Sequence, residues 1–500
     1  MSVELATGLG GVALFAAPGW ALSGCFPALR RLSPLRRFAY AYPLGVVAVA
    51  GSLYALSHLC GVPLRPPAVW TICGLPILAG AAAWVVRKRP PPPASQGKAR
   101  WGVRRWVRRS GGPLPIACAV LAAAAGLGVV AEAVSSPVTD WDGRMTWCVQ
   151  ARYLRHAGTV DAGVLRDRRW WLSNPRYPLL LPVAQVAVLE AFVADQDSHS
   201  FRLLYVAFFP ALLLLIYDGA RRSAGRSAAA TGALLAALIP FFSYGDGGAV
   251  STYSDMPLAC FFGGGVLLLL GRTPRGAQAA TGIAAGLLLA GAVLAKEEGS
   301  LLAIFALLLG GFLGAGRQRS VAQRGEPASP RRQPPVRSLA AAAAAAVPVG
   351  LALLLFASWR AGVPSRQDVN YLGLLVDGRW WPGVLTHIGE SLPALLHGMY
   401  NWQHWSLFWW MAPLLLLAGR RALRRPLHRR LLAAAAGPPL VAVAAYALYS
   451  RPVFLAVVSW ERFLLQAAVP LLIVLAAALR DVAARRLVPV LTRAPGEARS

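Results

Sequence analysis

The chain has 500 residues, of which 56% are hydrophobic and only 14% are charged, and its formal net charge is +29. So small a charged fraction excludes an ordinary soluble protein of this length and predicts an integral membrane protein. In a soluble protein this basic excess would suggest a nucleic-acid partner, but here the arginines gather in short segments between apolar stretches. The basic bias of cytoplasmic loops explains that pattern, so we expect no nucleic-acid partner.

The first four apolar stretches are long enough to cross a bilayer as helices, which takes about 17–25 residues. Segments 30–37 and 87–109 lie between them and are rich in arginine, so both are predicted to be cytoplasmic. The N-terminus is then outside, and the chain emerges on the external face after the fourth crossing. The predicted crossings are 5–27, 38–60, 68–86 and 114–134.

A long polar segment, 135–177, follows the fourth crossing and should be external. The next apolar stretch, 178–194, is short, and it contains two prolines and the polar residues Gln185 and Glu190. If it crossed the membrane, the later basic loops would lie outside, against the charge bias. We therefore predict that 178–194 is a re-entrant or interfacial helix that belongs to the external segment.

The remaining apolar stretches predict an all-α polytopic membrane protein with about 13 transmembrane helices besides that helix. We divide it into extra N-terminal helices with a basic linker (1–113), a core (114–315) and a C-terminal region (316–500). Segments 359–403 and 450–462 should be external, and the first shows the apolar spacing of a helix lying on the membrane surface. The later crossings are predicted near 201–219, 227–244, 256–270, 276–294, 300–315, 339–358, 404–418, 431–449 and 463–479.

Under this topology, several acidic and basic residues gather on the external side at helix ends. Acidic residues at such positions are costly and tend to be functional. Transfer of a sugar from a lipid phosphate needs a carboxylate that accepts a proton and fixed cations that hold the phosphate. The candidate catalytic acids are Asp140, Asp142 and Asp255, and the candidate substrate-binding residues are Tyr253, Lys296, Glu298, Arg360 and Arg462.

Each of these residues also has a simpler interpretation. Asp140 and Asp142 fit the solvated end of a helix, and Asp255 fits an N-terminal cap. Lys296 is placed to pair with either of the two glutamates that follow it, or to extend toward the interface. The tryptophan-rich pieces are typical of interfacial belts. No histidine or cysteine spacing indicates a metal site, and the use of a divalent metal stays open.

Five short motifs occur in order along the chain: WDGRMTWCVQARYL, NPRYPLLLP, YSDMPLACFF, AKEEGSLLA and SWERFLLQAAVPLLI. Together they resemble the GT-C integral-membrane glycosyltransferases, in particular the protein mannosyltransferase-like and aminoarabinose transferase-like branch. The resemblance covers about residues 114–480, so helices 5–86 look like an N-terminal addition. It implies a GT-C-like fold, a polyprenyl-phosphate sugar donor and inverting transfer on the external face.

The resemblance also implies roles for individual residues. Asp142 lies at the position of a catalytic acid in the first external loop, with Asp140 as the second candidate, and Asp255 matches an acid of the next external loop. Many members carry two adjacent acids in the first loop, whereas Trp141 separates them here, so the resemblance leaves both as candidates for the base. The positions that match contacts to the donor phosphate or sugar are Lys296, Glu298 and Arg462.

We therefore predict a glycosyltransferase of the bacterial plasma membrane, without a cofactor, that moves a sugar from a polyprenyl phosphate to a lipid, glycan or protein acceptor. Its other partners would be the membrane lipids. The alternative is a transporter or flippase for a lipid-linked or anionic substrate, which predicts charges at mid-membrane on paired broken helices. A scaffold subunit without activity is the third possibility. The identity of the sugar and of the acceptor stays open.

Overall fold

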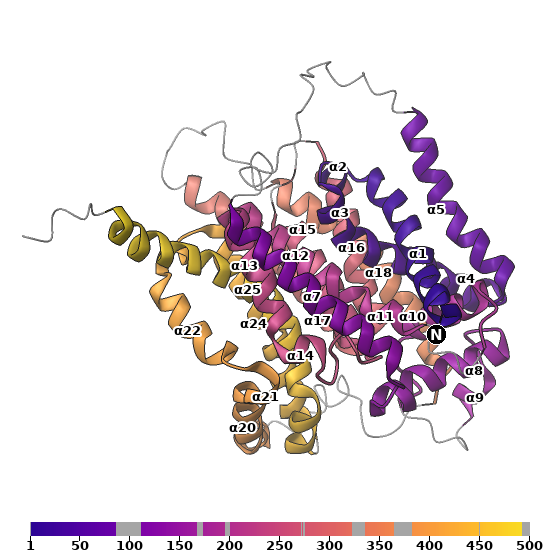
Figure 1. The fold of residues 1–500 in the computed structure, drawn as a ribbon. Coiled ribbons are helices and arrows are strands. Elements are labelled where there is room, and N and C mark those ends of the chain that lie inside the picture. The colour runs from indigo at the N-terminus through magenta and orange to yellow at the C-terminus, as the bar shows by residue number, and fades with distance from the viewer. Residues whose placement is uncertain are drawn as a thin grey trace, which may run out of the picture.

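The computed structural model describes residues 2–86, 112–167, 174–195, 201–271, 273, 276–322, 336–364, 383–449 and 451–492. Within these residues every element is a helix and no strand occurs, in agreement with the predicted all-α class (Figure 1). The predicted basic linker 87–109 and residues 365–382 of the predicted external segment 359–403 lie outside the described residues.

The chain up to residue 224 forms both short and long helices. Two of them, η1 and η2, are π-helical turns, which interrupt α-helices at local bulges. The elements are α1 (Ser2–Cys25), α2 (Pro27–Arg30), α3 (Pro34–Val46), η1 (Val47–Gly51), α4 (Ser52–Cys60), α5 (Pro66–Val86), α7 (Pro113–Ser135), η2 (Gly143–Cys148), α8 (Val149–Ala157), α9 (Gly163–Arg166), α10 (Leu180–Ala191), α11 (Arg202–Val206) and α12 (Phe208–Ala224).

The rest of the chain contains the longest helices. They are α13 (Arg226–Leu238), α14 (Pro240–Ser243), α15 (Asp255–Leu270), α16 (Gln278–Ala295), α17 (Glu297–Ala322), α18 (Val336–Ala361), α20 (Val384–Tyr400), α21 (Trp402–Trp405), α22 (Phe408–Ala418), α23 (Arg420–Leu423), α24 (Pro426–Leu448) and α25 (Pro452–Thr492).

In the described part of the chain, nine helical stretches are long and apolar enough to cross a membrane, as expected of an α-helical membrane protein. They correspond to nine of the predicted crossings. The other four predicted crossings fall on α13 with α14, α15, α17 and α22, so the total of about 13 stays a prediction. The nine stretches are Val3–Cys25, Pro34–Cys60, Pro66–Ala83, Pro113–Ser135, Arg202–Ala224, Gln278–Ala295, Leu339–Ala361, Pro426–Leu448 and Pro452–Arg485.

The stretch predicted as re-entrant or interfacial forms α10, which lies inside the protein. Its 12 residues rise by about 18 Å, well short of the roughly 30 Å hydrocarbon core of a bilayer. Every residue from Leu180 to Glu190 is buried, and α10 packs against α8, η1 and α5. Because α10 is surrounded by protein, it fits a re-entrant helix better than a helix lying on the membrane surface.

Three sequence-based boundaries differ from the structure. Segment 135–177 contains the helices η2, α8 and α9, where the sequence indicated a polar loop. The predicted crossing 227–244 is interrupted, because Ile239 is extended before Pro240 and ends α13. The predicted external loop 450–462 is almost entirely the beginning of α25, because no glycine or further proline interrupts the helix after its first residue there.

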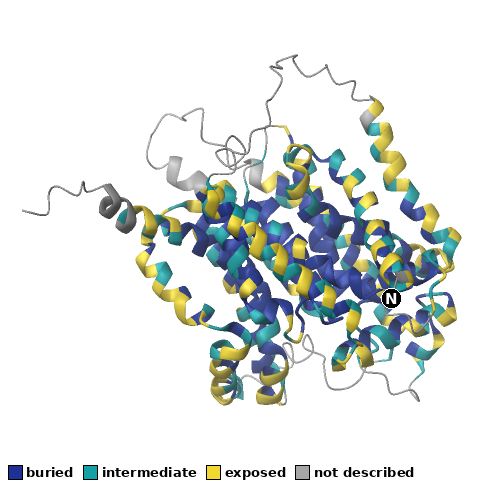
Figure 2. Ribbon diagram, viewed as in Figure 1, coloured by how far each residue is buried: buried dark blue, intermediate teal, exposed yellow. Residues whose placement is uncertain are grey.

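Buried residues fill the middle of the bundle, whereas α5 on the right and α7, which crosses the front of the view, carry many exposed residues (Figure 2). All residues of α15 are buried, and so are all residues of α25 from Phe463 to Ala478. In contrast, most residues of α5 and α7 are partly or fully exposed. Apolar faces of this kind are suited to contact with lipid.

Glycines allow α16 and α18 to pack closely. A methyl group on Gly282 would lie 2.2 Å from the carbonyl oxygen of Ala341, and one on Gly286 would lie 2.4 Å from that of Ala345. Larger side chains would push the two helices apart. This contact fixes the position of α18, whose last turn carries Arg360, relative to α16, which ends beside Lys296.

The predicted surface helix corresponds to α20. It is amphipathic, with Leu385 exposed and Leu395 buried, and it packs on α24 and α25. The Nδ1 atom of His387 lies 3.0 Å from the carbonyl oxygen of Ala447, so α24 holds α20 in part through this contact.

Candidate functional site

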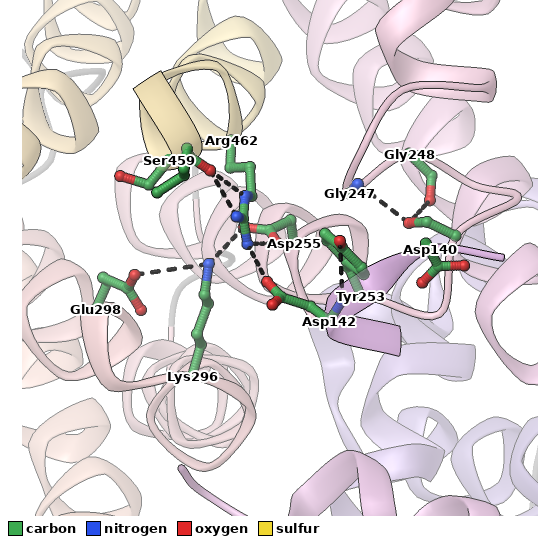
Figure 3. A network of polar contacts seen from close by, with 12 residues as sticks. Asp140, Asp142, Gly247, Gly248, Tyr253, Asp255, Lys296, Glu298, Ser459 and Arg462 are labelled. Carbon is green, nitrogen blue, oxygen red and sulfur yellow. Dashed lines mark hydrogen bonds and ion pairs between the residues drawn. The ribbon is translucent and has the colours of Figure 1, made fainter. Parts of the chain in front are cut away.

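Five charged residues from four separate segments meet in one network of ion pairs, drawn in Figure 3. All were candidates from the sequence. Lys296 occupies the single extended residue between α16 and α17, and this break points its side chain toward α15. We call the following residues the central network: Asp142 before η2, Asp255 at the start of α15, Lys296, Glu298 in the first turn of α17, and Arg462 in α25.

The ion pair between Asp255 and Lys296 is the buried centre of this network. Lys296 Nζ lies 2.8 Å from Asp255 Oδ1, and the two side chains are 5% and 1% exposed. Gln466 Nε2 donates to the same oxygen at 3.4 Å. Burial by itself would lower the pKa of Lys296, but the carboxylates of Asp255 and Glu298 outweigh it and raise the pKa above its ordinary value. Lys296 therefore stays charged, and Asp255 serves as its partner, while Ser254 occupies the N-cap position.

Arg462 bridges the two aspartates of the central network. Its Nη1 lies 2.7 Å from Asp142 Oδ2 and 4.0 Å from Asp255 Oδ2. Its Nε and Nη2 donate to the carbonyl oxygen of Val458, which fixes the guanidinium along α25. The ring of Tyr253 lies 5.1 Å from the guanidinium carbon, a cation–π contact, and its hydroxyl accepts a hydrogen bond from the Asp142 N–H at 3.1 Å. Tyr253 thus positions both residues.

Asp140 lies apart from the central network and joins two segments of backbone (Figure 3). Its Oδ2 accepts hydrogen bonds from the Thr252 N–H at 3.3 Å and the Thr252 hydroxyl at 3.1 Å. Gly143 is required beside it, because a methyl group there would lie 1.8 Å from that oxygen. Arg202 donates to one backbone carbonyl in each of the same two segments. Burial raises the pKa of Asp140, although Thr252 and Arg202 oppose this shift.

Arg360 belongs to a second ion pair next to the central network. Its Nη2 lies 2.9 Å from Glu297 Oε1, and Glu297 is adjacent in sequence to both Lys296 and Glu298. Burial raises the pKa of Glu297 to about 7; Arg360 and Arg176 oppose the shift, and the charge of Glu298 adds to it. Near neutral pH this carboxyl group is therefore present in both its charged and its neutral form.

Tyr177 lies near carboxylates of both ion-pair systems. It is half-buried, and its ring centroid is 5.6 Å from that of Trp147. Burial, followed by the charges of Glu298, Glu297 and Asp142, raises its pKa well above the ordinary value. The phenol therefore stays protonated and keeps a hydrogen to donate within the site.

The central network is partly open and has spare hydrogen-bonding capacity. The side chains of Asp142, Glu298 and Arg462 are 22%, 23% and 16% exposed. Three buried oxygens, Asp255 Oδ2, Glu298 Oε2 and Gln466 Oε1, have no hydrogen-bond partner among the described residues. Leaving such an atom unpaired costs about 1–3 kcal/mol, so donors of a bound molecule would be stabilised there. The described residues contain no group of three His, Cys, Asp or Glu side chains placed to hold a metal ion.

The sequence identified most of this site but not all of it. Six of its eight candidates lie in or against the central network, whereas Arg360 pairs beside it and Asp140 lies apart. Tyr177, Arg176 and Gln466 were not among the candidates. Gln466 follows Arg462 by four residues, which places both on one helix face, and this spacing was a usable signal. Arg176 and Tyr177 lie in the NPRY motif, whose role depends on tertiary contacts.

A scan of the sequence against protein-family models found no match, and searches of curated proteins and of solved structures also found none.

Proposed function

We propose that this protein is a membrane glycosyltransferase that moves a sugar from a polyprenyl phosphate to an acceptor on the external face of a bacterial plasma membrane. The observation that carries the proposal is one partly exposed carboxylate, Asp142, held 2.7 Å from Arg462 and joined through Asp255 to the buried cation Lys296. A proton acceptor beside two fixed cations is the combination that transfer from a phosphate ester requires. The order of the five GT-C-like motifs supports the same conclusion.

In the proposed reaction, Lys296 and Arg462 hold the donor phosphate, and Asp142 accepts a hydrogen bond from the acceptor hydroxyl. The hydroxyl oxygen forms a bond to the anomeric carbon while the bond from that carbon to the phosphate oxygen breaks. The bonding electrons go to the phosphate oxygen, which the two cations stabilise, and the proton goes to Asp142. Attack opposite the leaving phosphate inverts the anomeric centre. Asp255 and Glu298 keep Lys296 charged and in place.

Between the two candidates for the base, the geometry favours Asp142. Asp142 contacts Arg462, where the phosphate would lie, and is accessible from outside the protein. Asp140 instead has its Oδ2 occupied by the Thr252 N–H and hydroxyl. We therefore assign Asp140 a structural role, in which it holds the external segment against the turn that contains Thr252.

The alternative of a transporter or flippase is favoured by one observation. The buried pair Asp255–Lys296 lies where α16 gives way to α17 through an extended residue, and broken helices with buried charges are features of transporters. A transporter would carry a labelled anionic or lipid-linked substrate across a vesicle membrane without forming a glycosylated product. A flux assay with matched product analysis separates the two functions.

The test of the proposed function is sugar transfer by purified protein in lipid vesicles, with a panel of radiolabelled polyprenyl-phosphate sugars and a cell-envelope extract as acceptor. We compare wild type with Asp142→Asn and with Asp246→Asn, which removes an exposed acid from the turn before α15. We expect transfer by wild type and Asp246→Asn, and a rate about 10²–10⁴-fold lower for Asp142→Asn. Equal rates for both variants, with equal thermal stability, would refute the assignment of Asp142.

A further inference from the structure

Two arginines beside the central network lie near one carboxylate, that of Glu297. Arg360 Nη2 lies 2.9 Å from Glu297 Oε1. Arg176 lies within electrostatic range of both Arg360 and Glu297, and its buried Nε has no hydrogen-bond partner among the described residues. The repulsion between the two guanidinium groups is therefore only partly compensated. A second oxyanion would compensate it and would accept the unused N–H group.

The residues on both sides of this pair are held rigidly. Trp359, the neighbour of Arg360, is 1% exposed, and its Nε1 donates to the carbonyl oxygen of Val160 at 3.2 Å. On the other side, Gln150 Nε2 donates at 2.9 Å to the carbonyl oxygen of Asn174, two residues before Arg176. Both arginines therefore extend from fixed backbone, which lowers the entropic cost of binding an anion between them.

We infer that Arg176 and Arg360 form a second oxyanion subsite, which takes a phosphate or carboxylate group of a substrate other than the phosphate held by Lys296 and Arg462, and that Glu297 fills this subsite when it is empty. The assignment of this subsite to a substrate rests on the proposed function. Under that function, either the donor or the acceptor carries a second anionic group, which binds here. Glu297 lies between Lys296 and Glu298 in the sequence, so the two subsites are neighbours.

Protonation of Glu297 controls the subsite. The charged groups that face it are Arg360 from α18, Arg176 from the segment before α10, and Glu298 from its own helix. When Glu297 is ionised, the two arginines and this carboxylate sum to +1, and the carboxylate competes with an entering anion. When it is protonated, the sum is +2 and the competitor is neutral. Because anion binding is coupled to uptake of a proton by Glu297, affinity should fall as pH rises through about 7.

The experiment measures binding of sulfate and of acetate to the purified full-length protein in detergent by calorimetry at pH 6 and pH 8. Neither anion changes its charge in this interval, so a pH effect belongs to the protein. We expect two sulfate-binding events in wild type, one of which weakens about tenfold from pH 6 to pH 8. Arg176→Gln and Arg360→Gln should each weaken that event by about tenfold or more. Arg462→Gln should weaken only the other event.

Glu297→Gln keeps the shape of the side chain and serves as the decisive variant. It should bind sulfate at pH 8 as tightly as wild type does at pH 6, and its affinity should not depend on pH. Arg144→Gln, which removes an exposed arginine of the same external segment, should behave as wild type. Tighter binding of acetate than of sulfate to the pH-dependent event would identify the group as a carboxylate, and the reverse order would identify a phosphate.

The inference is overturned if wild type shows one pH-independent event, or if Glu297→Gln retains the pH dependence of wild type. These measurements need no sugar transfer. If both sulfate-binding events occur as expected but no donor sugar is transferred, the glycosyltransferase proposal is rejected and the subsite is retained. Transfer together with a single pH-independent binding event would reject the subsite alone.

Discussion

Replacement of Lys296 by methionine should destabilise the protein strongly, because it leaves Asp255 charged and buried. At 2.8 Å and an effective dielectric constant of about 20, the lost attraction amounts to about 6 kcal/mol. Arg462, 4.0 Å from the other carboxylate oxygen, retains about 4 kcal/mol of attraction on the same scale. Removal of one partner of a buried ion pair typically costs about 3–5 kcal/mol, and we expect Lys296→Met to fall in that range.

The assay is denaturant unfolding of purified protein in micelles, followed by tryptophan fluorescence. Lys296→Met is compared with the double variant Lys296→Met/Asp255→Asn, in which both charges are absent. The double variant should be about 1–3 kcal/mol more stable than Lys296→Met alone, because no buried carboxylate remains without its partner. Arg144→Gln, the loss of an exposed cation, should stay within about 0.5 kcal/mol of wild type. If Lys296→Met behaved like Arg144→Gln, or if the double variant were the least stable, the stabilising role assigned to the buried Asp255–Lys296 pair would be refuted.

Three further predictions concern residues outside the central network. Asp140→Ala leaves both donors of Thr252 unpaired, so it should lower stability by about 1–3 kcal/mol and lower the transfer rate much less than Asp142→Asn does. The hydrogen bond from His404 to Glu461 raises the pKa of His404, while burial opposes the shift. The stability from this pair is therefore fully present below about pH 6.5 and is lost as pH rises through the raised pKa, so His404→Gln should destabilise more at pH 6 than at pH 9. Asp218→Asn removes the carboxylate that Arg36, Tyr40 and Arg222 share, and should cost about 3–5 kcal/mol without changing the transfer rate of the folded protein.

Each of these predictions has a measurement that contradicts it. For Asp140→Ala it is a loss of transfer rate equal to that of Asp142→Asn, with stability unchanged. For His404→Gln, melting curves at pH 6 and pH 9 are compared with those of His397→Gln, which replaces an exposed histidine of α20. An equal effect of the two variants at both pH values would contradict the predicted pH dependence of the His404–Glu461 pair. For Asp218, a fall in the transfer rate per folded molecule would show coupling across the bundle. Its partner Arg222 lies against Gly271, just beyond the last residue of α15, whereas Asp255 is the first residue of that helix. The two sites are therefore separated by about 23 Å of helix.

The sequence alone determined the fold class and most of the helices. An apolar stretch of about 20 residues has few alternatives to a helix, because backbone groups in an apolar environment must bond within their own segment. It also indicated Asp142, Asp255, Lys296, Glu298 and Arg462, since charged residues at the ends of apolar helices stand out against a background of alanine and leucine.

The tertiary structure decided which of these residues act together. Asp140 and Asp142 are two residues apart in the sequence, yet Thr252 holds Asp140, while Arg462, 320 positions after Asp142, holds Asp142. Glu297 and Glu298 are neighbours, yet one faces Arg360 and the other faces Lys296. A local pattern fixes helices because their hydrogen bonds are local. Ion pairs across the bundle depend on how four distant segments pack, and no local pattern contains that information.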